Sequence, residues 1–281
     1  MKKSERYLIV VDLDGTLLHN YAEWDDEAIA TLKQLNQMGH MVMIATGRPF
    51  RSSFFVYQAL GLNSPLINYN GALVSHPFDE AFPKTDLRIS KDDVFQILDF
   101  VGDELINAFC EIHDDIYVLT YKPGVYPYLH ADGGILHVGP LQENLPENPN
   151  GCILFVTDKI VDALSDYITQ NFSDRLRCRY WGEQSQFNIM EVYNIHTNKG
   201  SGIVTTANYY GIPKDHIIAI GDGHNDIEMF NEANIRVAME NAHPLLLPYA
   251  THITKTNLNQ GVTLFLQDFF KDDLAKEKQN E

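Results

Sequence analysis

Short apolar runs and helical patterns alternate in the first part of the chain. Residues 6–14 include a continuous run of Leu, Ile and Val, which is typical of a strand buried on both faces of a parallel sheet. In residues 25–38 the apolar side chains recur at helical spacing after an acidic first turn, and residues 40–48 are again mostly apolar. A helical stretch ending near Gly61 and a short strand at residues 65–71 follow. This alternation predicts an α/β fold with a doubly wound, mostly parallel sheet.

The same alternation returns near the C-terminus. Helices are expected at residues 198–211 and 225–233, and short buried strands at residues 217–223 and 235–239. Because both ends of the chain show one pattern, we expect them to form one core together.

The residues between these two regions follow a different pattern. Amphipathic helices are predicted at residues 92–103 and 159–172, and several runs around them alternate apolar with polar residues. Such alternation is typical of strands in a sheet that is wet on one face. We therefore predict an inserted α+β domain at residues 84–188, within a core made of residues 1–83 and 189–281.

Composition and charge exclude several classes of partner. The 281 residues include 21 Lys or Arg and 38 Asp or Glu, which gives a formal net charge of −17. Because no basic run occurs, neither nucleic acid nor an anionic membrane is an expected partner. The sequence shows no membrane-spanning apolar run and no secretory signal pattern, so we expect a cytoplasmic protein. The 3 cysteines contain no CxxC pair and suit reduced, buried thiols.

The candidate chemistry lies at the ends of the predicted strands. In a doubly wound sheet, ligands bind beyond the carboxyl ends of the strands, so residues there converge although they are far apart in sequence. Most of the candidate residues directly follow a predicted strand. One of them, a lysine, is the first residue of the helix that precedes a strand near the C-terminus. They are Asp12, Asp14, Thr46, Gly47, Arg48, Lys199, Asp222 and Asp226.

This set carries an excess of negative charge. Two unit charges about 4 Å apart repel by about 4 kcal/mol at an effective dielectric constant of about 20, so four neighbouring carboxylates are expected to recruit a cation. Oxygen ligands without histidine favour Mg²⁺ over zinc. The hydroxyl of Thr46, the amides of a tight turn and the ammonium of Lys199 can receive the oxygens of a phosphate.

Four segments in this order resemble the motifs of the haloacid dehalogenase superfamily of phosphohydrolases. They are DLDGTL, ATGR, Lys199 and GDGHND. The large insert after the second motif, with NYNGA after the third strand, is similar to the Cof-type branch. The resemblance implies a Rossmann-like core and an α/β cap that lies over the active site and selects the substrate.

The resemblance also implies the role of each motif residue. Asp12 matches the nucleophile that becomes a phosphoaspartyl group, and Asp14 matches the general acid and base. The implied Mg²⁺ ligands are Asp12, Asp14 through its backbone carbonyl, Asp222 and Asp226, with Asp226 either a direct ligand or a supporting residue. The implied phosphate contacts are the amide of Leu13, Thr46, Gly47, Lys199 and Asn225.

For several other residues the sequence allows two interpretations. Arg48 either braces the fold through a salt bridge or contacts the substrate, and Asn70 and Gly71 either form a turn or lie beside the ligand. In the insert, three arginines alternate along one predicted strand, so that they share a face that meets either an anionic substrate or solvent. These arginines are Arg175, Arg177 and Arg179.

The pattern as a whole indicates a Mg²⁺-dependent phosphatase that hydrolyses a small phosphorylated metabolite, with a sugar phosphate as the preferred class. One alternative is phosphomannomutase-like transfer between sugar hydroxyls, for which the arginines of the insert are the only hint. Another is a phosphoaspartyl signalling or binding module, against which the insert and Asp14 beside Asp12 argue. A monomer and a homodimer are both compatible with the sequence.

Overall fold

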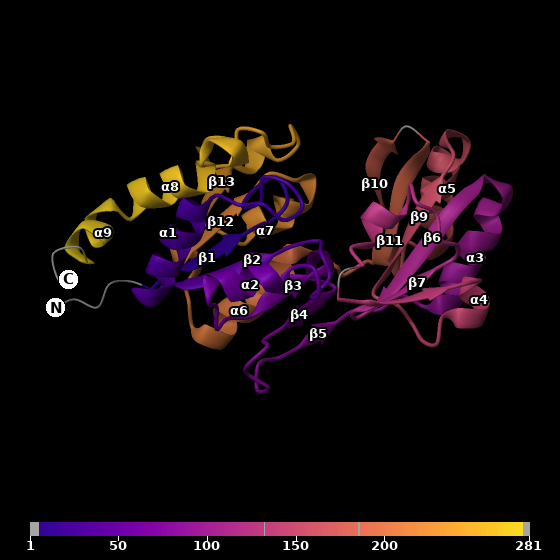
Figure 1. The fold of residues 1–281 in the computed structure, drawn as a ribbon, viewed down its shortest axis with the longest axis horizontal. Helices are drawn as coiled ribbons and strands as arrows, with labels where there is room; N and C mark the ends of the chain where they lie inside the picture. Colours follow the sequence, from indigo (N-terminus) through magenta and orange to yellow (C-terminus); the bar gives the residue numbers. More distant parts are fainter. Residues whose placement is uncertain (1–5, 132, 185, 278–281) are drawn as a thin grey trace. The chain divides into compact units, whose positions relative to one another are not determined.

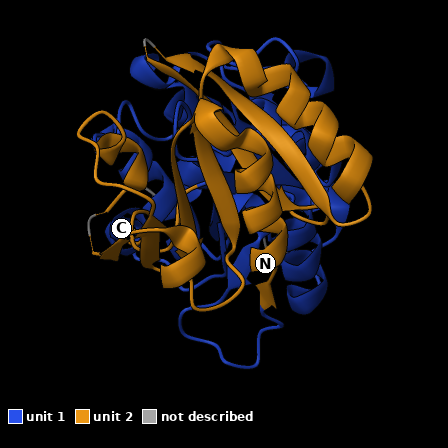
Figure 2. Cartoon of the chain, turned by 90° about the vertical axis from the view of Figure 1, so that its right-hand side faces the viewer, with its two compact units in different colours: residues 1–47, 55–84, 198–281 blue, residues 48–54, 85–197 orange. Residues whose placement is uncertain are grey.

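The computed structural model describes residues 6–131, 133–184 and 186–277 (Figure 1). They form two compact units, which Figure 2 shows in different colours. The first unit comprises the residues up to Gly47, residues 55–84 and the residues from Asn198 onward, and the second comprises residues 48–54 and 85–197.

The first unit is built on a sheet that is mostly parallel (Figure 1). Its strands lie in the order β14, β13, β12, β1, β2, β3, β4, and neighbours are parallel except for the antiparallel pair β3 and β4. The predicted α/β class with a doubly wound sheet is confirmed. The bounds are β1 (Leu8–Val11), β2 (Met41–Ala45), β3 (Leu66–Asn68), β4 (Leu73–Ser75), β12 (Ile217–Gly221), β13 (Ile235–Ala238) and β14 (His252–Ile253).

Helices cover both faces of this sheet. α1 (Asp26–Gln37) and α8 (Gly261–Phe269) pack together on one face, while α6 (Lys199–Tyr210) and α7 (Ile227–Asn231) enclose a buried apolar cluster on the other. Alternate residues of β1 therefore meet different helices, and all four are buried. This double burial explains why the strand reads as one continuous apolar run.

Local signals set the start of α1. The side chain of Asp25 accepts a hydrogen bond from the amide of Glu27 at 3.1 Å and caps the helix, and acidic residues fill the first turn. The remaining helices of the unit are α2 (Phe54–Leu60), whose first residue belongs to the second unit, and α9 (Lys271–Glu277).

The second unit is an α+β layer around a six-stranded sheet. The strand order is β10, β11, β9, β6, β7, β8, and neighbours are antiparallel except for the parallel pair β7 and β8. The strands are β6 (Leu105–Ile112), β7 (Asp115–Val118), β8 (Ile135–Val138), β9 (Gly151–Val156), β10 (Leu176–Gln184) and β11 (Phe187–Asn194). The unit also contains β5 (Thr85–Asp86), α3 (Lys91–Val101), α4 (Leu141–Asn144) and α5 (Val161–Phe172).

Each face of this second sheet is covered in a different way. Helices α3 and α5 bury one face in an apolar cluster, and the other face packs against the loop residues Val125 and Leu129. The observed unit runs to Thr197 rather than to residue 188, because β11 continues to Asn194. It also takes in residues 48–54, which no local pattern marks as separate from the core.

Among the helices in the described part of the chain, none is long and apolar enough to cross a membrane.

Asp86 is the centre of a polar cluster at the start of the second unit. Its carboxylate accepts hydrogen bonds from Arg88 at 2.8 and 3.1 Å, from Asn150 at 2.8 Å and from His113 at 3.0 Å. Partial burial acts to raise the pKa of Asp86, but the hydrogen bonds from Arg88, His113 and Asn150 outweigh it and hold this pKa well below its ordinary range. The ionised form therefore stabilises the folded unit.

We expect Asp86→Asn to lower the free energy of unfolding by about 1 to 2 kcal/mol near neutral pH. Because the pKa of Asp86 is depressed in the folded state, its contribution is present above the unfolded-state pKa of about 3.9 and is lost as the pH falls further. Urea unfolding at several pH values measures both effects. Asp115→Asn, at a carboxylate 3.8 Å from the nearest nitrogen of His137, is the control. A difference from wild type that stays constant down to low pH would contradict this account.

Candidate active site

The site is formed where parallel strands of the first unit end. Asp12 follows β1, Thr46 follows β2 and Asp222 follows β12. The amide of Asp12 donates a hydrogen bond to the carbonyl of Ile220 at 3.0 Å, which keeps the turn after β1 alongside β12. Polar residues that are far apart in sequence therefore converge at one edge of the sheet.

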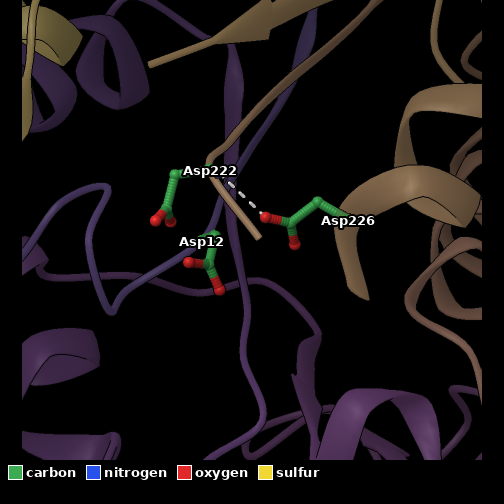
Figure 3. Close-up of side chains that lie close together, drawn as sticks. All are labelled: Asp12, Asp222 and Asp226. Carbon is green, nitrogen blue, oxygen red and sulfur yellow. Dashed lines mark hydrogen bonds between the residues drawn. The ribbon is translucent and has the colours of Figure 1, made fainter. Parts of the chain in front are cut away.

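Three carboxylates lie together at this edge (Figure 3). One carboxylate oxygen from each of Asp12, Asp222 and Asp226 lies within 4.8 Å of the other two. Burial raises the pKa of Asp12 well above its ordinary value, and burial followed by the charge of Asp226 raises the pKa of Asp222 to about 6. The protein thus holds these like charges together at an energetic cost that a bound cation would offset.

Lys199 provides a buried positive charge beside the carboxylates. Its Nζ, which is fully buried, donates to Oδ1 of Asp12 at 2.5 Å and to Oδ1 of Asp226 at 2.6 Å. Burial alone would lower the pKa of Lys199, but the charges of Asp12 and Asp226 outweigh it and raise this pKa above its ordinary value. Lys199 therefore stays charged. One ammonium among three carboxylates still leaves the cluster negative.

The carboxylate of Asp226 also organises the loop after β12. Its Oδ2 accepts hydrogen bonds from the amides of Asp222 at 3.0 Å and Gly223 at 2.9 Å, while Oδ1 accepts from Lys199. Both oxygens of Asp226 therefore already have donors, and they fix the positions of Asp222 and Lys199.

The turn after β1 separates the two motif aspartates. The predicted strand extended to Asp14, whereas β1 ends at Val11 and Asp14 lies in the following turn. Asp12 is 6% exposed and belongs to the group of three carboxylates, while Asp14 is exposed and lies outside that group. The two side chains therefore occupy different environments.

Gly15 allows this turn to pack against Asp222. Its φ of +77° lies in the left-handed region, and a Cβ at this position would lie 2.3 Å from Oδ2 of Asp222. The next residue, Thr16, donates from its hydroxyl to Oδ1 of Asp222 at 2.8 Å, and Asn241 donates to the carbonyl of Gly15, also at 2.8 Å. Neither Thr16 nor Asn241 is among the residues expected from the sequence to form the site. The DGT segment was a signal for Thr16, but no motif marked Asn241.

A second network connects the residues after β2 and β3. The buried Thr46 donates from its amide to the carbonyl of Ile67 at 2.9 Å and accepts from the amide of Asn70 at 3.0 Å. The side chain of Asn225 then donates to Oδ1 of Asn70 at 2.8 Å. Asn70, in a left-handed conformation with φ +53°, therefore both forms the turn and links two motifs.

The other candidate residues of the first two motifs and the turn after β3 lie in different surroundings. Gly47 is exposed after Thr46, and Leu13 is fully buried. Gly71 ends the short turn that packs against α6. Arg48 is buried, lies in the second unit and donates to the carbonyl of Ser52 at 3.2 Å.

Two of the three arginines of the insert pair with different carboxylates. Arg175 precedes β10 and donates to Asp93 of α3 at 2.8 and 3.2 Å. Arg179 instead donates to Glu191 of β11 at 3.1 Å, with its guanidinium over the rings of Tyr193 and Trp181. Carboxylates of the second unit therefore already balance the charges of both arginines.

The matches to known proteins extend over most of the chain. A model for the haloacid dehalogenase-like hydrolase family matches residues 9–266. The 5-amino-6-(5-phospho-D-ribitylamino)uracil phosphatase YitU from Bacillus subtilis is 32% identical over 269 residues, which cover 95% of this chain and 99% of that protein. YwtE, a phosphatase of the same description from that organism, is 27% identical and covers 95% of this chain and 99% of its own length. The crystal structure of TM0651 from Thermotoga maritima has 25% identity and a TM-score of 0.78, over 94% of this chain and 97% of that one.

The chain belongs to the haloacid dehalogenase-like hydrolases. The family predicted from the four motifs is confirmed, and the phosphatases among the relatives support a phosphatase enzyme.

Gly15→Ala tests whether the turn after β1 holds Asp222 in place for a cation. We expect the variant to weaken Mg²⁺ binding by about tenfold or more, because the added methyl group displaces a carboxylate of the cluster. Calorimetric titration with Mg²⁺ measures the affinity. Gly39→Ala is a matched control, since Gly39 also has a positive φ, +101°, but a Cβ there would have nothing within 4 Å. Equal Mg²⁺ affinities of the two variants would contradict this role of Gly15.

Proposed function

We propose that this hydrolase is a Mg²⁺-dependent phosphatase of small phosphorylated metabolites, with a sugar phosphate as the leading substrate class. The observation that carries the proposal is the buried Lys199, which bridges Asp12 and Asp226 beside Asp222. Asp12 is held by an ammonium within a cluster whose negative charge would bind a cation. A carboxylate in this position is suited to attack phosphorus, because positive charge balances the negative charge of both the carboxylate and the phosphate.

The donor set fits Mg²⁺. Hard divalent cations prefer oxygen ligands, and the three carboxylates offer oxygens within 4.8 Å of one another without histidine or cysteine. Asp12 and Asp222 would hold the ion directly, with the backbone carbonyl of Asp14. Asp226 would support them, because both of its oxygens already accept hydrogen bonds. When bound, Mg²⁺ would neutralise charge on the phosphate and on the attacking carboxylate.

Asp12 is the proposed nucleophile. Lys199 holds Oδ1 of Asp12, and a lone pair of this carboxylate that neither Lys199 nor the ion occupies would form the bond to phosphorus in line with the leaving group. As the phosphorus–oxygen bond to the substrate breaks, the electron pair of that bond goes to the leaving alcohol oxygen. The product of this step is a phosphoaspartyl group on Asp12.

Asp14 is the proposed proton-transfer residue. Its exposed position suits a group that first gives a proton to the leaving alcohol and then takes one from water. This water attacks the phosphorus of the phosphoaspartyl group, so that inorganic phosphate leaves and the carboxylate of Asp12 is restored.

The remaining motif residues would bind the phosphate oxygens. The proposed donors are the hydroxyl of Thr46, the ammonium of Lys199, the amides of Leu13 and Gly47, and the side chain of Asn225. Thr46 and Asn225 are connected through Asn70, which supports their acting together. We also propose that the second unit is the cap, which selects the leaving group and excludes water.

The relatives refine the choice of substrate. YitU and YwtE are phosphatases of 5-amino-6-(5-phospho-D-ribitylamino)uracil, in which the phosphate is carried by a ribityl chain. We propose that compound as the first to test, beside hexose and pentose phosphates. We further propose that the enzyme acts in the cytoplasm, as a monomer or homodimer, and on neither nucleic acid nor membrane.

No observation favours the two alternatives. The mutase-like alternative relied on a shared face of three arginines, and two of these are paired with Asp93 and Glu191. The signalling alternative requires no acid or base, whereas an exposed carboxyl group at Asp14 lies in the turn that follows Asp12.

Asp12→Asn is expected to lower phosphate release by about a thousandfold or more, because a carboxamide is a poor nucleophile toward phosphorus. The measurement is a phosphate-release assay with Mg²⁺ over a panel of sugar phosphates that includes the ribitylaminouracil phosphate. Asp268→Asn, at a highly exposed carboxylate of α8, should retain wild-type turnover. Turnover by Asp12→Asn close to wild type would rule out the proposed nucleophile.

A further inference from the structure

Arg51 forms a buried guanidinium contact in the second unit that the proposed chemistry leaves unexplained. Its side chain is 2% exposed and forms an ion pair with Glu111 of β6. Its Nε donates to the carbonyl of His130 at 2.9 Å and its Nη2 donates to that of Leu129 at 2.9 Å. The backbone amide of Arg51 donates to Oδ1 of Asp114 at 2.9 Å. The residue is therefore fixed through both its backbone and its side chain.

The surrounding chain is shaped to admit this side chain. A Cβ on Gly134 would lie 2.8 Å from Cδ of Arg51 and 2.6 Å from the carbonyl oxygen of Asp114. A side chain at this position would therefore require Arg51 or the backbone of Asp114 to shift. The contact is thus built from three separate parts of the second unit, β6, the loop with Leu129 and the segment of Arg51 itself.

The segment that carries Arg51, residues 48–54, is internally braced. Arg48 donates to the carbonyl of Ser52 at 3.2 Å, and the amide of Phe54 donates to the carbonyl of Phe50 at 2.9 Å. The rings of Phe50 and Phe54 are stacked with centroids 4.7 Å apart. A displacement at Arg51 would therefore move the segment as one piece rather than be absorbed within it.

The other end of this segment is bonded to a proposed phosphate contact. The chain passes from the first unit to the second between Gly47 and Arg48, one residue after Thr46. Thr46 is itself fixed by hydrogen bonds with Ile67 and Asn70. Gly47 is thus joined on one side to Thr46, which has hydrogen bonds within the first unit, and on the other to the segment that Arg51 anchors in the second unit.

We propose that Arg51 is a positioning residue that couples the second unit to the Thr46–Gly47 turn, so that the anchored segment 48–54 holds the phosphate-binding groups of this turn in their reactive geometry. The inference rests on the proposed function, since it assigns Arg51 a role in the geometry of that phosphate site. Arg51 contacts neither substrate nor reacting atoms. Its effect is transmitted through the backbone.

The test compares Arg51→Lys, which keeps the charge but loses the planar fork, with wild type in the intact chain. We expect kcat to fall by about tenfold or more with p-nitrophenyl phosphate and with the best sugar phosphate, while KM changes little, because misplaced groups slow the chemical step. Amide hydrogen exchange of the peptide that spans residues 44–50 should become faster in the same variant. Glu111→Gln, which removes the charge but keeps an oxygen acceptor, should show both effects in weaker form.

Arg175→Lys is the control for a purely structural role. Arg175 also binds a carboxylate through two hydrogen bonds in the second unit, but it lies far along the chain from Thr46. We expect its kcat to change by less than about twofold at a temperature at which every variant is folded. The inference is overturned if Arg51→Lys and Glu111→Gln retain wild-type kcat and wild-type exchange of residues 44–50, or if Arg175→Lys loses as much activity. Absence of phosphatase activity in the wild type would refute the proposed function instead. In that case, amide hydrogen exchange of residues 44–50 in Arg51→Lys and wild type would still test whether Arg51 is coupled to the Thr46–Gly47 turn.

Discussion

The buried ammonium of Lys199 is the interaction on which the rest of the site depends. Without it, Asp12 and Asp226 would be two carboxylates removed from water with no countercharge, at a cost of several kcal/mol each. With it, Asp226 can hold the amides of Asp222 and Gly223, and the group of carboxylates keeps a negative excess that a cation would balance. The fold supplies this arrangement by starting α6 at Lys199, beside the ends of parallel strands.

The second unit is connected to the same residues through the backbone. The chain passes between the units at four places, one directly after Gly47 and another directly before Asn198, which caps the helix of Lys199. Residues that we propose to bind phosphate therefore lie within two positions of both crossings. In our account, a cap of this kind can influence the geometry of phosphate binding as well as the choice of leaving group.

The sequence predicted the parts of the site that local patterns encode. Continuous apolar runs marked the buried strands, and Asp12, Thr46 and Asp222 follow β1, β2 and β12 in the structure. It did not reveal Asn241 or Arg51, whose partners lie 226 residues away at Gly15 and 60 residues away at Glu111. Such contacts depend on tertiary packing, which no local periodicity records. For the same reason the short strands β4 and β8 were not predicted.

The central claim is that Asp12, held by Lys199, takes the phosphoryl group onto its own carboxylate. Mass spectrometry of the Asp14→Asn protein, quenched in acid after mixing with Mg²⁺ and p-nitrophenyl phosphate, whose phenolate leaves without a proton from Asp14, tests it most directly. Our account predicts that the peptide containing Asp12 gains the mass of one phosphoryl group, because the residue that activates water for the second step is missing. An unmodified Asp12 peptide at every quench time, or the same mass gain in an Asp12→Asn protein, would contradict it.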